Sequence, residues 1–234
     1  MSAEIMFWNQ ETSFIFEKVN NTLRNLNVSF DMDGVEINSA KPAVEKLNKF
    51  FSTNYTTDDL LSYWTMVDWI KKERPDIEDP KEFARNLWNS DDVMTRARPE
   101  SGAWLLSRKL EDNLIRPKRI TMRPSKVRKA TFNWYMENMK WVDPGLIYVQ
   151  NQIDYNDSYK VDKINELGIN LHFDDSVDDA ENIVAYTKAN VVLVPQPSNS
   201  TYINSNPRIF TPKLSEFGDM PKMLAVYLSL GQIL

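Results

Sequence analysis

Apolar residues recur along the chain with two alternating periods, which predicts helices and strands in succession. Helix-like spacing of Phe14, Phe16, Val19, Leu23 and Leu26 predicts an amphipathic helix over residues 12–26. Short β-prone runs predict strands at 27–30, 119–121, 146–149, 169–173 and 191–194. Helical patterns predict helices at 125–139, 158–167, 177–187 and 213–228. This alternation is typical of βαβ units, so we predict an α/β fold whose parallel sheet is covered by helices on both faces.

The segment of residues 40–115 differs in composition from the rest of the chain. It has helical periodicity, is rich in charged and aromatic residues, and is interrupted by Pro75, Pro80 and Pro99. We therefore predict a helical cap over residues 40–115, inserted into a core formed by residues 1–39 and 116–234. Residues 195–212 are rich in Pro, Asn and Ser and are predicted to form a loop.

Composition narrows the classes of function. The net charge of -5 argues against stable nucleic-acid binding, because such binding relies on excess Lys and Arg. The absence of cysteine excludes thiolate catalysis and cysteine-ligated metals, and the single histidine, His172, excludes a multi-histidine metal site. No apolar run is long enough to span a bilayer, and residues 1–10 lack the pattern of a secretory signal, so we expect a cytoplasmic protein without membrane contact.

The amphipathic helix at 12–26 precedes the first predicted strand as an N-terminal extension. We expect it either to pack on the edge of the sheet or to form a contact in a homodimer. The sequence leaves both alternatives open.

Acidic residues follow two of the predicted strands. Asp31 and Asp33 come after the first strand, and Asp174 and Asp175 come after strand 169–173. In parallel sheets, ligands bind outside the carboxyl ends of the strands, so we expect these carboxylates to converge there. At an effective dielectric near 20, two close carboxylates repel by about 4 kcal/mol, so the cluster requires a cation or a bound proton. Because all the donors are oxygens, the sequence favours Mg²⁺.

The same edge of the predicted sheet offers groups for a phosphate ester. Thr121 ends the second predicted strand, and Lys160 begins a helix that leads towards Asp174. A hydroxyl, an ammonium and backbone N–H groups of the turn at Gly34 suit phosphoryl oxygens. A carboxylate can attack phosphorus covalently, and a second carboxyl can exchange protons with the leaving group and with water.

Four short motifs, in order, resemble those of the haloacid dehalogenase (HAD) superfamily. The segment Val-Ser-Phe-Asp-Met-Asp-Gly-Val at 28–35 is similar to the first motif, and Ile-Thr at 120–121 to the second. Lys160 followed by Glu-Leu-Gly-Ile at 166–169 resembles the third, and Phe-Asp-Asp-Ser at 173–176 the fourth. The resemblance implies a three-layer Rossmann-like core with a parallel sheet and a small helical cap inserted after the first strand.

The resemblance also implies roles for individual residues. Asp31 would be the nucleophile and a magnesium ligand, and Asp33 the general acid and base that also gives its backbone carbonyl to the metal. The remaining assignments are Thr121, Met122 and Lys160 as ligands of the phosphoryl group, and Asp174, Asp175 or both as further magnesium ligands. Lys163 competes with Lys160 for its role, and His172 is expected to be a satisfied structural histidine.

Within the superfamily, the motifs look most like those of the 5′(3′)-deoxyribonucleotidase branch. This implies hydrolysis of nucleoside 5′-monophosphates, deoxynucleotides in particular. The chain departs from the family pattern at Glu36, where an apolar residue is usual, and at Met122, where alanine is common.

The cap supplies candidate substrate contacts. Tyr63, Trp64 and Trp69 could stack on a nucleobase, although aromatics at helical spacing more often form the core of a cap. Arg123 is expected either to reach the phosphate or a base edge or to lie at the surface. The alternatives to a nucleotidase are a phosphatase for another phosphomonoester, such as a sugar phosphate or a polynucleotide end, and a non-catalytic binding module with the same fold.

Overall fold

Short runs of β-branched and aromatic residues form a parallel sheet in the computed structural model, which describes residues 10–151, 156 and 158–232 apart from the side chains at 10, 11, 63 and 232. The sheet has the strand order β5-β4-β1-β6-β7-β8. The strands are β1 (Val28–Phe30), β4 (Lys118–Thr121), β5 (Ile147–Val149), β6 (Leu171–Asp174), β7 (Asn190–Leu193) and β8 (Ile209–Phe210). All neighbouring pairs are parallel. The order reverses beside β1, so the binding crevice expected of such a sheet lies at the carboxyl ends of β1 and β6.

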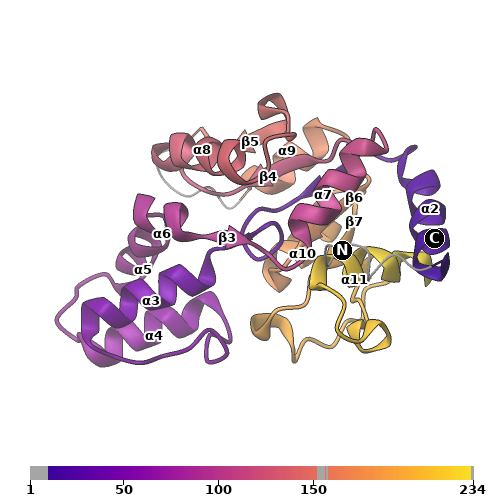
Figure 1. The fold of residues 1–234 in the computed structure, drawn as a ribbon. Helices are drawn as coiled ribbons and strands as arrows, with labels where there is room; N and C mark the ends of the chain where they lie inside the picture. Colours follow the sequence, from indigo (N-terminus) through magenta and orange to yellow (C-terminus); the bar gives the residue numbers. More distant parts are fainter. Residues whose placement is uncertain (1–9, 152–155, 157, 233–234) are drawn as a thin grey trace.

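Helices cover both faces of this sheet (Figure 1). One hydrophobic cluster joins β1 to α2 (Gln10–Leu23), α7 (Ala103–Asp112), α8 (Arg128–Asn138) and α11 (Lys222–Ser229). A second cluster joins the sheet to α9 (Tyr159–Glu166) and α10 (Val177–Tyr186). The predicted three-layer α/β core with a parallel sheet is therefore confirmed. None of the helices in the described part of the chain is long and apolar enough to cross a membrane.

The N-terminal helix α2 packs inside the core. Its Val19 and Leu23 side chains are buried, and the ring of Phe16 lies 5.2 Å from that of Tyr227 on α11. The helix thus packs on α11 rather than on the edge of the sheet. A homodimer contact through this region stays a prediction.

Four helices form the cap, which Figure 1 shows to one side of the sheet: α3 (Ala40–Phe51), α4 (Tyr63–Glu73), α5 (Pro80–Trp88) and α6 (Asp91–Arg96). Their apolar side chains make a hydrophobic cluster of their own. Ser62 and Thr65 form a reciprocal capping box at the start of α4, and Asp79 caps α5 with Pro80 in its first turn. The cap is connected to the core by an antiparallel two-stranded ribbon, β2 (Ile37–Asn38) and β3 (Arg98–Pro99).

The packing differs from the sequence prediction at three places. The apolar side chains of α7 belong to the core cluster, so packing favours an end of the cap near β3 rather than at residue 115, and the division into domains stays a prediction. The predicted loop 195–212 contains β8, which, like the β2–β3 ribbon, is too short to produce a periodic pattern. The predicted helix 213–228 is divided into η4 (Leu214–Phe217) and α11, with Gly218 at φ 54° and Pro221 between them.

If the cap folds as a cooperative unit of its own, a cavity in its core should affect the cap alone. Ile70 of α4 and Ile183 of α10 are both fully buried, one in the cap cluster and the other in the core cluster of α9 and α10. We expect each substitution by alanine to cost about 2–5 kcal/mol, because it removes buried methyl groups and leaves a cavity. Native-state hydrogen exchange should quicken mainly in α3–α5 for Ile70→Ala and throughout the sheet for Ile183→Ala. Equal acceleration everywhere in both variants would contradict a separate cap unit.

Candidate functional site

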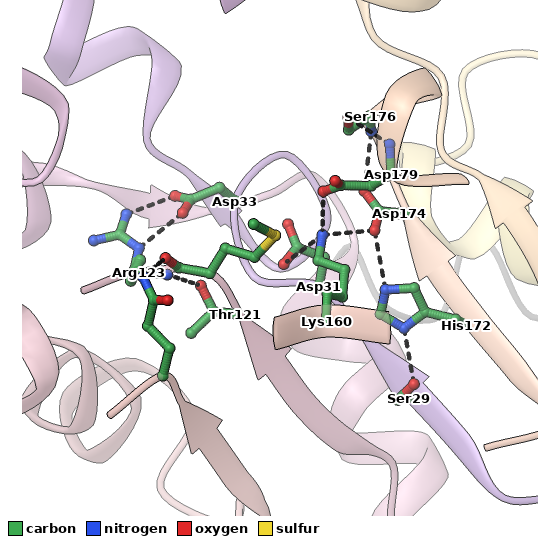
Figure 2. A network of polar contacts seen from close by, with 12 residues as sticks. Ser29, Asp31, Asp33, Thr121, Arg123, Lys160, His172, Asp174, Ser176 and Asp179 are labelled. Atoms are coloured by element: carbon green, nitrogen blue, oxygen red, sulfur yellow. Dashed lines mark hydrogen bonds and ion pairs between the residues drawn. The ribbon is translucent and has the colours of Figure 1, made fainter. Parts of the chain in front are cut away.

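Three carboxylates meet at the carboxyl ends of β1 and β6, and Figure 2 shows two of them, those of Asp31 and Asp174. Asp31 directly follows β1, and its backbone N–H donates to the carbonyl of Phe173 on β6 at 2.8 Å. Asp174 ends β6, and Asp175 follows it. One oxygen from each of Asp31, Asp174 and Asp175 lies within 4.8 Å of the others. Sheet topology thus brings together residues that are far apart in sequence.

The ammonium group of Lys160 lies beside these carboxylates. Its Nζ is 2.7 Å from Asp174 Oδ2, 2.6 Å from Asp179 Oδ2 and 3.4 Å from Asp31 Oδ1. Burial disfavours the charged form, yet the three carboxylates together raise the pKa of Lys160 well above its usual value. Lys160 therefore provides a permanent positive charge in the site. Asp179 was not among the predicted residues, although its place in the first turn of the helix after Asp174 was a usable signal.

Hydrogen bonds fix the orientation of Asp174, which is fully buried. Its Oδ1 accepts from the backbone N–H of Ser176 at 3.0 Å, and its Oδ2 lies 3.0 Å from His172 Nε2. His172 Nδ1 lies 2.8 Å from the hydroxyl of Ser29. Burial lowers the pKa of His172, so the neutral ring donates from Nε2 to Asp174 and accepts from Ser29. His172 is a satisfied structural histidine that orients a carboxylate of the site.

The charges in the cluster are incompletely balanced. Burial, opposed by Lys160 and reinforced by the neighbouring carboxylates, raises the pKa of Asp31 well above its usual value. Burial and Asp174 raise the pKa of Asp175 to about 8. The raised pKa values mean that negative charge in this cluster is unfavourable, and a small divalent cation would neutralise it. The carboxylates of Asp31, Asp174 and Asp175 are hard oxygen donors, so they fit Mg²⁺.

Gly34 makes room for Asp175. It has φ 71°, and a Cβ at this position would lie 2.1 Å from Asp175 Oδ2, far inside contact distance. The Gly34 carbonyl accepts from Gln196 Nε2 at 2.5 Å, and Asn199 Nδ2 donates to the carbonyls of Asp175 and Val194, both at 2.8 Å. The segment predicted to be a loop therefore holds the Asp175 backbone in place, a role that its sequence did not suggest.

Asp33 lies in a different environment from Asp31. Its carboxylate accepts from Arg123 Nε at 2.7 Å and from Nη2 at 2.6 Å, and it also accepts from the hydroxyl of Ser39. Burial opposes ionisation, but Arg123 and Ser39 outweigh it and lower the pKa of Asp33. Figure 2 shows the Asp33 carboxylate turned towards Arg123, whereas that of Asp31 is turned towards Lys160. Arg123 is buried, which excludes the surface role considered for it.

The end of β4 supplies the third side of the site. Thr121 is buried, and its Oγ1 accepts from the backbone N–H of Arg123 at 3.2 Å. The Met122 carbonyl accepts from Gln150 Nε2 at 2.6 Å, and Gln150 is itself fully buried. Gln150 was not predicted, although it directly follows a strand of the same sheet and so lies at the same edge.

The aromatic residues proposed to contact substrate have different environments in the cap. Trp69 is buried in the cap cluster and stacks on Tyr55, with ring centroids 4.2 Å apart and planes at 6°. Trp69 is therefore part of the hydrophobic core of the cap. Trp64 is half-exposed, with Lys81 Nζ 4.7 Å from its ring centroid. The side chain of Tyr63 lies outside the described residues.

The fold is similar to that of solved HAD structures. A HAD hydrolase of family IA, variant 3, from Entamoeba histolytica is 16% identical over 88% of this chain and 99% of its own, with a TM-score of 0.53. A Thermotoga maritima protein provisionally described as a beta-phosphoglucomutase is 15% identical over 89% and 100%, with a TM-score of 0.51. A HAD family hydrolase from Deinococcus radiodurans with bound phosphate and sodium is 15% identical over 73% and 83%, with a TM-score of 0.50. No family model and no curated protein matches the sequence. At these identities the likeness shows the fold alone.

Substitution of Gly34 tests the close approach of Asp175. Gly34→Ala should displace the Asp175 carboxylate and weaken Mg²⁺ binding by about tenfold or more, as loss of ligand orientation does at metal sites. Gly168→Ala is a matched control, because Gly168 also has positive φ, 59°, but a Cβ there would lie 3.9 Å from the nearest atom, Asn27 Nδ2. Both variants should lose about 1–2 kcal/mol of stability from backbone strain. Calorimetric titration with Mg²⁺ measures the difference, and equal affinities in the two variants would contradict a metal site that includes Asp175.

The raised pKa of Asp175 predicts how stability changes with pH. Its pKa is about 8 in the folded protein against an ordinary 3.8. Between pH 3.8 and pH 8 the folded state therefore holds a proton that the unfolded state has lost. The stability that this proton contributes is lost as pH rises through that range. In chelator, wild type should lose up to about 1.4 kcal/mol per pH unit from this group, and Asp175→Asn should remove that contribution. Urea unfolding at pH 5, 6.5 and 8 measures both slopes. Asp178→Asn, an exposed neighbour, is the control, and a slope unchanged by Asp175→Asn would rule out the protonated carboxyl.

Proposed function

We propose that this chain is a Mg²⁺-dependent phosphatase that hydrolyses small phosphomonoesters through a covalent aspartyl-phosphate on Asp31. The observation that carries this proposal is the clustering of Asp31, Asp174 and Asp175 beside the Lys160 ammonium at the switch point of the sheet. A fold shared with HAD hydrolases, one of them with bound phosphate and sodium, supports it. We also propose a cytoplasmic location.

In this mechanism an Asp31 oxygen attacks phosphorus, and the bond from phosphorus to the ester oxygen breaks with its electron pair leaving on that oxygen. Lys160 and the strand-end groups of Thr121 and Met122 would bind the non-bridging phosphoryl oxygens. When bound by the three aspartates, Mg²⁺ supplies positive charge that offsets the repulsion between carboxylate and phosphate. Water then attacks the phosphorus and releases inorganic phosphate, which regenerates Asp31.

Asp33 is the proposed proton carrier. It would protonate the leaving oxygen and later accept a proton from the attacking water. Because Arg123 lowers the pKa of Asp33, the carboxyl has to leave Arg123 before it can hold a proton near neutral pH. In the proposed mechanism, the ionised Asp33 bound to Arg123 is therefore a resting form, and Asp33 transfers protons only after this contact is broken.

Different observations favour two classes of substrate. The similarity of the motifs to those of deoxyribonucleotidases favours nucleoside 5′-monophosphates, with Trp64 as the remaining described aromatic for a base. The likeness of the fold to a protein provisionally described as a beta-phosphoglucomutase favours sugar phosphates. Because Trp69 stacks on Tyr55, it is no longer a candidate for stacking on a base, which weakens the argument for nucleotides. Nucleotides and sugar phosphates should therefore both be tested in the first assay.

Phosphate release from a panel of nucleotides, sugar phosphates and 5′-phosphorylated oligonucleotides tests the proposal. We expect Mg²⁺-dependent turnover that Asp31→Asn lowers by at least about 1,000-fold, because the nucleophile is lost while the shape of the site is kept. Asp178→Asn, which changes an exposed carboxylate, should retain activity. If no ester is hydrolysed but Mg²⁺ with phosphate raises the melting temperature, the chain is instead a binding module.

A further inference from the structure

A second buried group of charged residues lies behind the site. Glu36 and Arg119 are 1% and 0% exposed, and Arg119 Nη2 donates to Glu36 Oε1 at 3.1 Å. Arg119 Nε lies 3.2 Å from Glu36 Oε2, which also accepts from the Tyr135 hydroxyl at 2.6 Å. A buried ion pair is often no more stabilising than well-packed apolar residues of the same volume. Stability alone therefore gives little reason for Glu36 to occupy this position.

Arg119 connects several elements of the core. Its Nη1 donates to the carbonyl of Pro117 at 2.6 Å, and its Nη2 donates to the hydroxyl of Ser107 on α7 at 2.9 Å. The guanidinium carbon also lies 6.0 Å from the ring centroid of Phe30, the residue before Asp31. Arg119 and Glu36 are thus fixed by partners on α7, α8 and β4, and neither side chain can move without breaking several contacts.

The pair joins the two segments that carry the reactive groups. Glu36 ends the turn that contains Asp31 and Asp33, and its backbone N–H donates to the Met32 carbonyl at 2.9 Å. Arg119 lies on β4, in the same strand as Thr121. In addition, the Glu36 carbonyl accepts from the backbone N–H of Glu100 at 2.9 Å, so the turn is also attached to the returning cap linker.

We propose that Glu36, Arg119 and Tyr135 are positioning residues that fix the turn of Asp31 and Asp33 relative to Thr121. The proposal rests on the phosphatase function proposed above, because attack on phosphorus requires the nucleophile and the phosphate ligands to be held at a set separation. An apolar pair would fill the same space but would lack directional bonds between the turn, β4 and α8. The ion pair therefore fixes the position of the turn relative to β4 and adds little net stability.

Tyr135→Phe tests this with little change in shape. It removes one hydroxyl that donates to Glu36, whereas Tyr227→Phe removes an equally buried hydroxyl that donates to Asn20 at 2.6 Å, away from the site. We expect Tyr135→Phe to lower kcat about tenfold with KM within about twofold, and Tyr227→Phe to leave both unchanged. Equal kcat values for the two variants at comparable melting temperatures would overturn the positioning role.

The double variant Glu36→Leu with Arg119→Met removes both charges together, which avoids leaving one of them buried and unpaired. Its melting temperature should stay close to that of wild type, because removal of the costly buried pair offsets the loss of partners by the Tyr135 hydroxyl and the Glu111 carboxylate, while kcat falls at least about tenfold. Hydrogen exchange at the amides of Asp31, Gly34 and Ile37, which are bonded within or beside the turn, should be at least about tenfold faster.

Hydrogen exchange does not depend on turnover, so the two proposals fail separately. Unchanged exchange at these amides in the folded double variant refutes positioning. If wild type hydrolyses no substrate but hydrogen exchange is still faster in the double variant, the phosphatase proposal is refuted. The restraint on the turn is then established all the same.

Discussion

The site depends on the burial of one ammonium group, that of Lys160, among carboxylates directly after β1, on β6 and on α10. Each of these charges would be costly to bury alone, and removal of one partner from such a group commonly costs about 3–5 kcal/mol. The ammonium therefore requires Asp31, Asp174 and Asp179 to be in place together, which couples three elements of the core. One positive charge does not balance all the neighbouring carboxylates, and burial together with the charge of Asp174 raises the pKa of Asp175. The burial of several carboxylates around one ammonium group thus also favours the binding of a metal cation.

Sequence patterns predicted those parts of the structure that local physical chemistry determines. The core strands are short β-prone runs whose side chains are mostly buried, and the rule that ligands bind at the carboxyl ends of parallel strands predicted that Asp31, Thr121 and Asp174 lie at one edge. Two-residue strands such as β8 have no period to detect. Gln150 and Asp179 take their importance from neighbours that are distant in sequence, and the inclusion of α7 in the core depends on packing with α11.

Asp31 and Asp33 show why the roles of residues in a motif require three-dimensional structure. The two carboxylates are separated by one residue, yet burial and like charges raise the pKa of Asp31 whereas Arg123 lowers that of Asp33. The chain turns at Gly34, so the two side chains face different partners. A motif string records both as aspartate, but only the three-dimensional surroundings, that is burial, nearby charges and hydrogen bonds, distinguish a carboxyl that resists ionisation from one that is already ionised.

The same turn also connects the chemistry to the cap. β2 begins at Ile37, directly after Glu36, and the Glu36 carbonyl is bonded to the residue that follows β3, Glu100. The cap is therefore joined to the core by a short ribbon that starts at the turn of Asp31 and Asp33, and this ribbon limits where the cap can lie relative to the carboxylates. A rigid anchor on the core side of that ribbon, supplied by Arg119 and Tyr135, would allow cap sequences to change without displacing Asp31. Under the proposed phosphatase function, this arrangement would allow one core to keep its chemistry while the cap determines the substrate.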